Sequence, residues 1–191
     1  KQDKNSAKIL KPLLRGRDLG KYTYRNENLW LIGTFPTLNL DIDDFPAIKD
    51  YLLSFGKERL EQSGEDNARK KTGNEWFETQ DQISYWQNFE QPKILYPNMV
   101  KDISFTYDDK GFYTNQKCFI LTGEKIKYLL GILNSKLFRY CFEEDFPELQ
   151  GNSREINKVV FEEIPIKYPN EKEEELVSTL VDYILYLYDT E

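Results

Sequence analysis

Histidine is absent from the 191 residues of the chain. Its absence removes the commonest general base, the Ser-His-Asp arrangement and most zinc sites, so an enzyme built on this chain would have to work through carboxylates, tyrosine or lysine. Cysteine is scarce, because Cys118 and Cys141 are the only two, and both lie in apolar sequence. Buried thiols of a cytoplasmic protein are therefore expected rather than a disulfide.

Long apolar runs and familiar catalytic motifs are missing as well. No segment approaches the roughly 18 apolar residues of a membrane-spanning helix, so no membrane partner is expected. The first residues, Lys1-Gln2-Asp3-Lys4, include neither an apolar signal region nor an initiating Met, which indicates a fragment of a longer protein. Neither a glycine-rich phosphate loop nor a G-x-S-x-G nucleophile elbow occurs.

Two groups of acidic residues remain as candidates for chemistry. One consists of three aspartates between residues 41 and 44. The other is Asp108-x-Lys110, which matches half of a metal-dependent nuclease motif, in which a carboxylate holds Mg²⁺ and a lysine assists. The DDKG sequence at 108–111 also has the composition of a turn, and the turn is the favoured interpretation.

The net charge of −7 is unevenly distributed along the chain. Residues 143–191 hold 14 acidic and four basic side chains, whereas residues 1–25 hold eight basic and two acidic ones. Such asymmetry is more informative about partners than the net charge, because a basic segment attracts polyanions locally. The N-terminal segment therefore favours contact with a polyanion, and a solvated basic loop is the alternative.

Three stretches are candidates for contact with nucleic acid. The first is the basic N-terminal segment, and the second is a polar loop in which a basic triplet precedes aromatic residues, a combination that suits phosphate and base contact. The third is a glycine-bearing loop within residues 145–158. The candidate DNA-binding residues are Arg15, Arg17, Lys21, Arg69, Lys70, Lys71, Trp76, Asn152, Ser153, Arg154 and Lys158.

The order of elements predicts an α+β fold, with an irregular mixed sheet, a central apolar helix and a C-terminal amphipathic helix. We expect residues 1–168 to form one domain, and residues 169–191 to form a helix that packs on it or on a partner domain. The strands are expected at residues 29–32, 93–96 and 118–121, in a hairpin of 103–107 with 112–114, and in a closing strand at 159–166.

The central helix is expected at about residues 126–142, with Thr122 as its N-cap candidate. Asn134-Ser135-Lys136 interrupts its apolar face. We expect Asn134 and Ser135 to hydrogen-bond nearby backbone where the helix meets the sheet or a returning loop.

Two further helices flank this centre. One begins at Pro46 and is expected to continue to about residue 62. Asn170 is expected to cap the last helix, whose acidic first turn suits the helix dipole. The apolar stripe of this last helix consists of Leu176, Leu180, Ile184 and Leu187, with Val177, Val181 and Tyr188 alongside.

Taken in order, several segments resemble the TaqI-like C-terminal specificity domain, the target-recognition domain of type II restriction-modification methyltransferases and of combined methyltransferase-endonucleases. The domain is similar in role to the specificity subunits of type I systems. The resemblance extends from about Lys8 to about Tyr188. The segments that carry it are KPLLRGRDLGKY (11–22), Trp30-Leu31-Ile32, FPAIKDYL (45–52), QPKILYP (91–97), SFTYDDKGFYTNQKCFILTGE (104–124), YLLGILNSKLF (128–138) and EEIPI (162–166).

The resemblance implies a non-catalytic module that recognises a short sequence in double-stranded DNA within a bacterial restriction-modification system. In the family, a preceding Rossmann-like domain binds S-adenosylmethionine and, in most members, methylates adenine N6. That upstream methyltransferase domain would be the second partner, and the module itself would need no cofactor. The sequence lacks the Asn/Asp-Pro-Pro-aromatic tetrapeptide of amino-group methyltransferases. The reading residues of the family vary with the target, so none is carried over.

Two other functions remain open at this level. The acidic helix at 171–188 would be the working surface of a protein-interaction or assembly domain. A metal-dependent nuclease that uses Asp108 is the third possibility.

Overall fold

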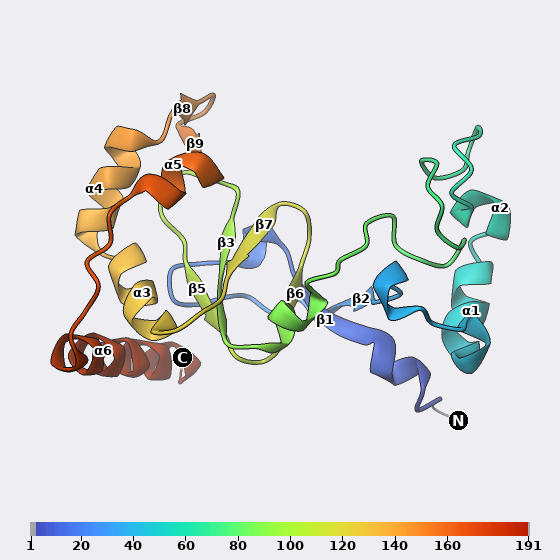
Figure 1. Cartoon of the computed structure of the whole chain (residues 1–191), viewed down its shortest axis with the longest axis horizontal. Helices are drawn as coiled ribbons and strands as arrows, with labels where there is room; N and C mark the ends of the chain where they lie inside the picture. The colour runs from blue at the N-terminus through green and yellow to red at the C-terminus, as the bar shows by residue number, and fades with distance from the viewer. Residues whose placement is uncertain (1–2, 191) are drawn as a thin grey trace. The chain divides into compact units, whose positions relative to one another are not determined.

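The computed structural model describes residues 3–190 (Figure 1). The chain divides into two compact units. The first comprises Lys1–Pro12 and Trp30–Trp86, and the second comprises Leu13–Leu29 and Gln87–Glu191. Each unit has a hydrophobic core of its own, and the mixture of helices and small sheets confirms the predicted α+β class.

The first unit consists of short helical turns and long irregular segments. Its core is formed by Ile9, Ile42, Ile48 and Phe77. The helix predicted to continue to about residue 62 is two helices, because Gly56 between them adopts a φ of 88° that ends the helical path. The elements are η1 (Ser6–Ile9), β2 (Leu29–Ile32), η3 (Pro36–Leu38), η4 (Ile42–Asp44), α1 (Pro46–Leu53) and α2 (Lys57–Leu60), and β1 (Leu10–Leu14) continues into the second unit.

An antiparallel sheet in the order β5-β3-β7 forms the centre of the second unit. All five residues of its middle strand, β3, are buried. The end of β1 pairs in parallel with β6, and a third small sheet has the order β4-β9-β8. The bounds are η2 (Gly16–Asp18), η5 (Trp86–Glu90), β3 (Lys93–Pro97), β4 (Met99–Val100), β5 (Thr106–Asp108), β6 (Tyr113–Thr114), β7 (Cys118–Leu121), β8 (Glu148–Leu149) and β9 (Ser153–Glu155).

Helices cover this sheet in two layers. Leu130 and Leu133 of α3 (Ile126–Leu133) lie in one core cluster with Ile94 of β3. α6 (Glu171–Asp189) packs on α3 at Gly131, where a Cβ would lie only 2.7 Å from Cγ1 of Val177. The glycine therefore allows the two helices to approach closely. α4 (Lys136–Asp145) and α5 (Lys158–Glu163) complete the unit.

The polar triplet in the central helix is structural, as predicted. The Asn134 side chain donates from Nδ2 to the carbonyl of Phe105 at 2.8 Å and accepts from the Phe105 N–H at 3.3 Å. Ser135 caps α4, because its Oγ accepts from the N–H of Phe138 at 3.1 Å. The helix is consequently two helices, and the first begins at Ile126 and not after the predicted cap Thr122.

The hairpin predicted around the DDKG turn is wrong. β5 pairs with β3, whereas β6 pairs with β1 in another sheet. The physical reason is Asp108, whose carboxylate accepts from the N–H groups of Lys110 and Phe112 at 2.9 Å each and pairs with the Nζ of Lys93 at 2.5 Å. Both ends of this ion pair are fully buried, and the bonds turn the chain away from β5.

The closing strand predicted at 159–166 is also wrong, since residues 158–163 form α5. Asn157 caps this helix by accepting from the N–H of Val159 at 2.9 Å. In this helix, the ring centroid of Phe161 lies 5.5 Å from the ring centroid of Tyr96 and 6.0 Å from that of Phe138. This packing overrides the β-propensity of the local sequence.

The C-terminal helix begins after Asn170 as predicted, whereas the prediction of buried thiols holds for Cys118 and not for Cys141, which is half-buried. Asn170 and Glu173 form a capping box at the start of α6. Cys118 and Cys141 are free thiols, and burial raises the pKa of Cys118 to about 12. Within residues 3–190, no helix combines the length and apolarity needed to cross a bilayer.

The buried ion pair predicts a strong contrast between two adjacent aspartates. Replacing Asp108 by Asn leaves the ammonium of Lys93 buried without its counter-charge, so the free energy of unfolding should fall by about 3–5 kcal/mol. Asp109→Asn changes an exposed neighbour and should stay within about 0.5 kcal/mol. Urea unfolding followed by circular dichroism measures both, and equal effects would contradict the assigned role of Asp108.

Candidate nucleic-acid interface

The turn at η2 is held by a reciprocal contact between Arg15 and Asp18. The Asp18 carboxylate accepts from the backbone N–H, Nε and a terminal nitrogen of Arg15, each at 2.8 Å. This contact lowers the pKa of the buried Asp18 carboxyl and raises the pKa of the Arg15 guanidinium. Arg15 thus fixes the turn, and Arg17 within it is exposed, with no ion pair among residues 3–190.

Segments distant in sequence meet at this turn. A Cβ on Gly16 would lie 3.4 Å from the Cβ of Pro97 and 3.6 Å from the carbonyl oxygen of Lys117, so the turn packs against the end of β3 and the start of β7. The same Lys117 carbonyl accepts from the N–H of Asn98 at 2.8 Å. Arg17 and Lys117, both exposed, are therefore carried by adjoining segments.

The β8–β9 hairpin is attached to the same region. Met99 and Val100 of β4 pair with Glu155 and Arg154 of β9. Asn98 adds a bond from its Nδ2 to Glu155 Oε1 at 3.3 Å. Segment 97–100 thus connects the η2 turn to the hairpin, and brings two of the three predicted stretches into one region of the second unit.

The candidate DNA-binding residues of the hairpin differ in whether their side chains are already bonded within the chain. Arg154 donates to the carbonyl of Phe146 and pairs with Glu148 at 3.5 Å, so its guanidinium fixes the base of the hairpin. Ser153 donates from its Oγ to the carbonyl of Gln150 at 2.9 Å. Asn152, at the tip with a φ of 57°, has an exposed side chain. The tip therefore presents an amide.

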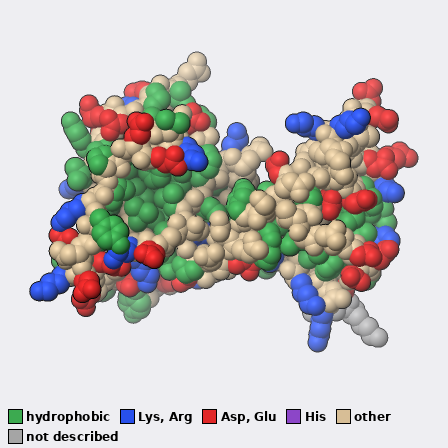
Figure 2. Space-filling view, in the orientation of Figure 1, with side chains coloured by type: hydrophobic (Ala, Val, Ile, Leu, Met, Phe, Trp, Pro, Cys, Tyr) green, Lys and Arg blue, Asp and Glu red, His purple; other side chains and the backbone are tan. Residues whose placement is uncertain are grey.

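The other two candidates of the second unit lie elsewhere. Lys21 is exposed on the turn that follows η2, and this turn is anchored by a bond from Thr106 Oγ1 to the carbonyl of Gly20 at 2.7 Å. Lys158 is 79% exposed and 3.6 Å from Glu162. It stands at the rim of an apolar groove of about 550 Å³ between β7 and α5, and Figure 2 shows hydrophobic side chains gathered in that area.

Arg69, in the first unit, is occupied by structural contacts. Its guanidinium donates to the carbonyls of Leu60 at 2.7 Å, of Glu78 at 2.9 Å and of Trp76, which uses three of its five N–H groups. Burial lowers the pKa of the guanidinium. Arg69 thereby closes the irregular segment 60–78 on itself.

The neighbours of Arg69 differ from it. Lys70 and Lys71 are exposed on the same segment. The ring of Trp76 packs edge-on against Phe77 at 5.7 Å, and the Nζ of Lys57 lies 5.9 Å from its centroid. The triplet therefore contains one structural and two solvent-facing cations.

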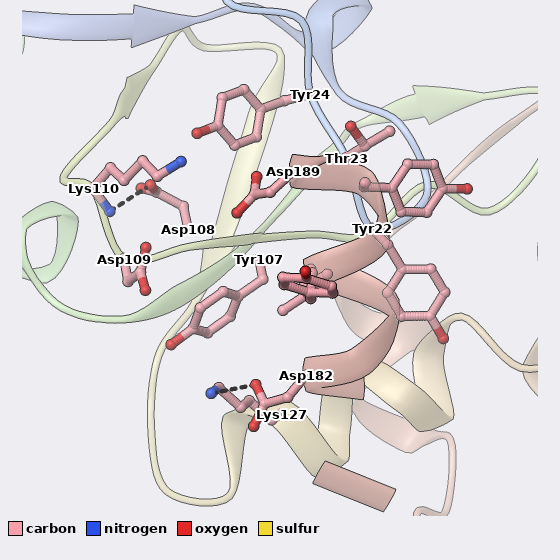
Figure 3. A pocket seen from close by; sticks show the side chains of 13 residues that line it. Tyr22, Thr23, Tyr24, Tyr107, Asp108, Asp109, Lys110, Lys127, Asp182 and Asp189 are labelled. Carbon is pink, nitrogen blue, oxygen red and sulfur yellow. Dashed lines mark hydrogen bonds and ion pairs between the residues drawn. The ribbon is translucent and has the colours of Figure 1, made fainter. Parts of the chain in front are cut away.

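Figure 3 shows a pocket of about 390 Å³ in the second unit, which is lined mainly by tyrosine, aspartate and lysine. Lys127 pairs with Asp182 at 2.5 Å, and its Nζ is 5.5 Å from the centroid of the Tyr107 ring. The Nζ of Lys110 lies 5.7 Å from the centroid of Tyr24. The lysines of this pocket thus already contact acids and rings of the chain itself.

The geometry around Asp108 does not support a nuclease centre. Its carboxylate is buried against Lys93 and two backbone N–H groups, while the Lys110 side chain faces Tyr24. In the described part of the chain, residues 3–190, no three His, Cys, Asp or Glu side chains gather as metal ligands would. The turn interpretation of DDKG is therefore the one that fits.

Sequence reasoning missed Lys117 and the 97–100 segment. Lys117 is an isolated lysine before a strand, and only the packing of its backbone against Gly16 brings its segment next to the turn that carries Arg17. Asn98 and the exposed Met99 lie just beyond the strand predicted at residues 93–96. No local pattern marks them, so only the fold identifies them.

Comparisons with known proteins place this geometry in context. Residues 11–166 match the family model of the TaqI-like C-terminal specificity domain. The chain is also similar to the type II methyltransferase M.BstVI of Geobacillus stearothermophilus, with 28% identity over 148 residues, which are 74% of this chain and 26% of the relative. The chain therefore spans about a quarter of the length of this curated relative.

Mutation can distinguish the structural cation Arg69 from the solvent-facing cation Lys70 by its effect on stability. Arg69→Ala removes three bonds to carbonyls and should lower the free energy of unfolding by about 1–3 kcal/mol, whereas Lys70→Ala should leave it unchanged. All three tryptophans of the chain lie in this unit, so their fluorescence during urea unfolding reports the difference. Equal stability of the two variants would show that the Arg69 contacts do not hold the segment.

Proposed function

The chain belongs to the TaqI-like C-terminal specificity domain family, and we propose that it recognises a short sequence in double-stranded DNA for a type II methyltransferase. The observation that carries this proposal is the match of the specificity-domain model to residues 11–166. The similarity to a type II methyltransferase over 148 residues supports it. This chain is then the DNA-recognition part, and catalysis is assigned to another region.

The geometry of the second unit supports one way of docking on DNA. Arg17 and Lys117 would contact phosphates and fix the register of the protein on the duplex. The β8–β9 hairpin, joined to the same region through residues 97–100, is a two-stranded ribbon of a kind that the major groove admits. The exposed amide of Asn152 at its tip can both donate to and accept from a base edge.

The remaining candidates are assigned by what they contact. Arg15, Arg69 and Arg154 hold their loops through bonds within the chain and would shape the interface. Four exposed lysines are proposed as further phosphate contacts, and these are Lys21, Lys70, Lys71 and Lys158.

The parent protein is proposed to be a site-specific DNA methyltransferase that uses S-adenosylmethionine and modifies adenine N6. The chain covers 26% of its methyltransferase relative, which leaves room for a catalytic region in a longer parent. The sequence has no glycine-rich nucleotide loop and no methyltransferase tetrapeptide, so cofactor binding is assigned to that upstream region. A combined endonuclease activity of the parent is a further proposal.

Selection from a random duplex library tests the recognition function. The chain should enrich one short motif, and Asn152→Gly should relax the preference at one position of that motif, at a loss of about 1–3 kcal/mol. Glycine keeps the positive φ of this site and removes only the amide. Asn28→Gly, at an exposed Asn with a φ of 53°, is the matched control and should select the wild-type motif. Failure of the wild-type chain to enrich any motif would overturn the proposal.

Salt dependence of binding separates the proposed phosphate contacts from other cations. On the selected duplex, Arg17→Ala and Lys117→Ala should each reduce the slope of log K against log salt by about 1, because each contact displaces counterions. Lys172→Ala, an exposed cation on α6, should leave the slope unchanged. A slope that responds to Lys172 and not to Arg17 would place the DNA on another face.

The chemistry of the parent is tested by mapping modified bases. DNA from cells that express the full-length parent should carry N6-methyladenine within the motif that this chain selects. In vitro, the parent should form this base only when S-adenosylmethionine is supplied, and heat denaturation of the parent should abolish its formation. Methylation of cytosine at that motif would refute the adenine assignment. Incubation of unmethylated motif DNA with the parent and Mg²⁺ tests for cleavage in the same preparation.

A further inference from the structure

α6 has apolar residues on two faces, although one stripe was predicted. On one face, Val177 and Val181 pack on Gly131 of α3. On the other, the side chains are exposed to solvent, with Leu176 at 63%, Leu180 at 55%, Tyr183 at 61% and Leu187 at 45%. These four residues are called the outer stripe. They form a row of large apolar groups that nothing in the described chain covers.

The spacing of the outer stripe is that of a helix-pairing seam. Its members follow one another at intervals of four, three and four residues, which is the a/d pattern by which one helix packs into the groove of another. A solvated helix would not need large apolar groups at these positions. α6 also lies beyond residues 11–166, so the family match does not account for the stripe.

The charges beside the stripe restrict what can cover it. α6 carries six acidic residues and one basic one, Lys172. Three of the acids pair with lysines of the same unit, but Glu171 and Glu175 are exposed and have no ion pair among residues 3–190. Phosphate would be repelled by this face. A second copy of α6 packed in parallel would oppose the acidic first turn to its own counterpart.

The position of α6 within its unit also favours a partner other than DNA. In Figure 1 the β8–β9 hairpin lies at one end of the second unit and α6 at the other. DNA bound along the hairpin would leave the outer stripe free for another partner.

We propose that the outer stripe docks on an apolar, basic-rimmed helical surface of the methyltransferase region of the parent polypeptide. The identity of this partner rests on the proposed function, whereas its chemistry follows from the stripe and its acidic border. The apolar row supplies the buried contact, and Lys or Arg at the rim of the partner surface would face Glu171 and Glu175. α6 then fixes the recognition domain to the catalytic region.

Hydroxyl-radical footprinting of side chains tests the docking. The 191-residue chain and the full-length parent are compared, and labelling of the outer stripe should fall about fivefold in the parent as its residues pass from exposed to buried. Leu137 of α4 is 72% exposed and serves as the reference side chain, whose labelling should not change. Addition of the selected duplex to the 191-residue chain should leave labelling of the stripe unchanged.

A double variant, Leu180→Gln with Tyr183→Gln, provides the second measurement. It should lower the melting temperature of the full-length parent and restore labelling of Leu176 and Leu187, and it should leave the melting temperature and motif selection of the 191-residue chain as they are. Leu137→Gln is the matched exposed control and should affect neither protein.

Three results would overturn the proposal. They are equal labelling of the stripe in chain and parent, protection of the stripe by DNA, and a concentration-dependent dimer of the 191-residue chain, seen by sedimentation, that protects the stripe. Motif selection is measured in a separate experiment. If the chain selects no motif but the stripe is protected in the parent, the DNA-recognition function fails and the docking stands. If the chain selects a motif but the stripe is not protected, the docking fails.

Discussion

The second unit depends on one buried ion pair, between Lys93 and Asp108. These residues face each other in the register of β3 and β5, and neither side chain is exposed. Burying two charges is costly unless each is fully bonded, and here the Lys93 ammonium also donates to the carbonyl of Phe89 at 2.5 Å, while Asp108 accepts two backbone N–H groups. The pair therefore joins the sheet to the turn that sends the chain on to β6 and then to β7, which lies beside the proposed DNA-binding region.

Local signals were sufficient for the elements whose stability is local. The capping box at Asn170 starts α6, and the apolar run of β3 forms a buried strand. Asn134 was expected to bond backbone near the sheet, and its partner is Phe105. The hairpin and the closing strand could not be predicted, because Asp108 is held by the distant Lys93, and because Phe161 packs among rings that only the fold assembles.

The candidate site was predictable only as a set of basic loops. Sequence alone does not distinguish Arg17, which is exposed, from Arg69 and Arg154, whose guanidinium groups bond carbonyls of their own loops. Whether an arginine is exposed or bonded within its loop depends on which backbone carbonyls point toward it in the folded loop. Lys117 was missed for the opposite reason, since a single lysine carries no pattern and the close packing at Gly16 places it.

Two regions of one unit thus carry different chemistry. One joins the exposed cations Arg17 and Lys117 to the β8–β9 hairpin, and the other is the acidic helix α6 with its exposed apolar stripe. The central claim is that DNA lies on the first of these. Amide hydrogen exchange of the 191-residue chain, with and without its selected duplex, tests it most directly. The account predicts slower exchange on DNA binding at residues 15–18, 97–100, 115–118 and 148–155, and no change along α6. Slower exchange along α6, with none in those four segments, would contradict it.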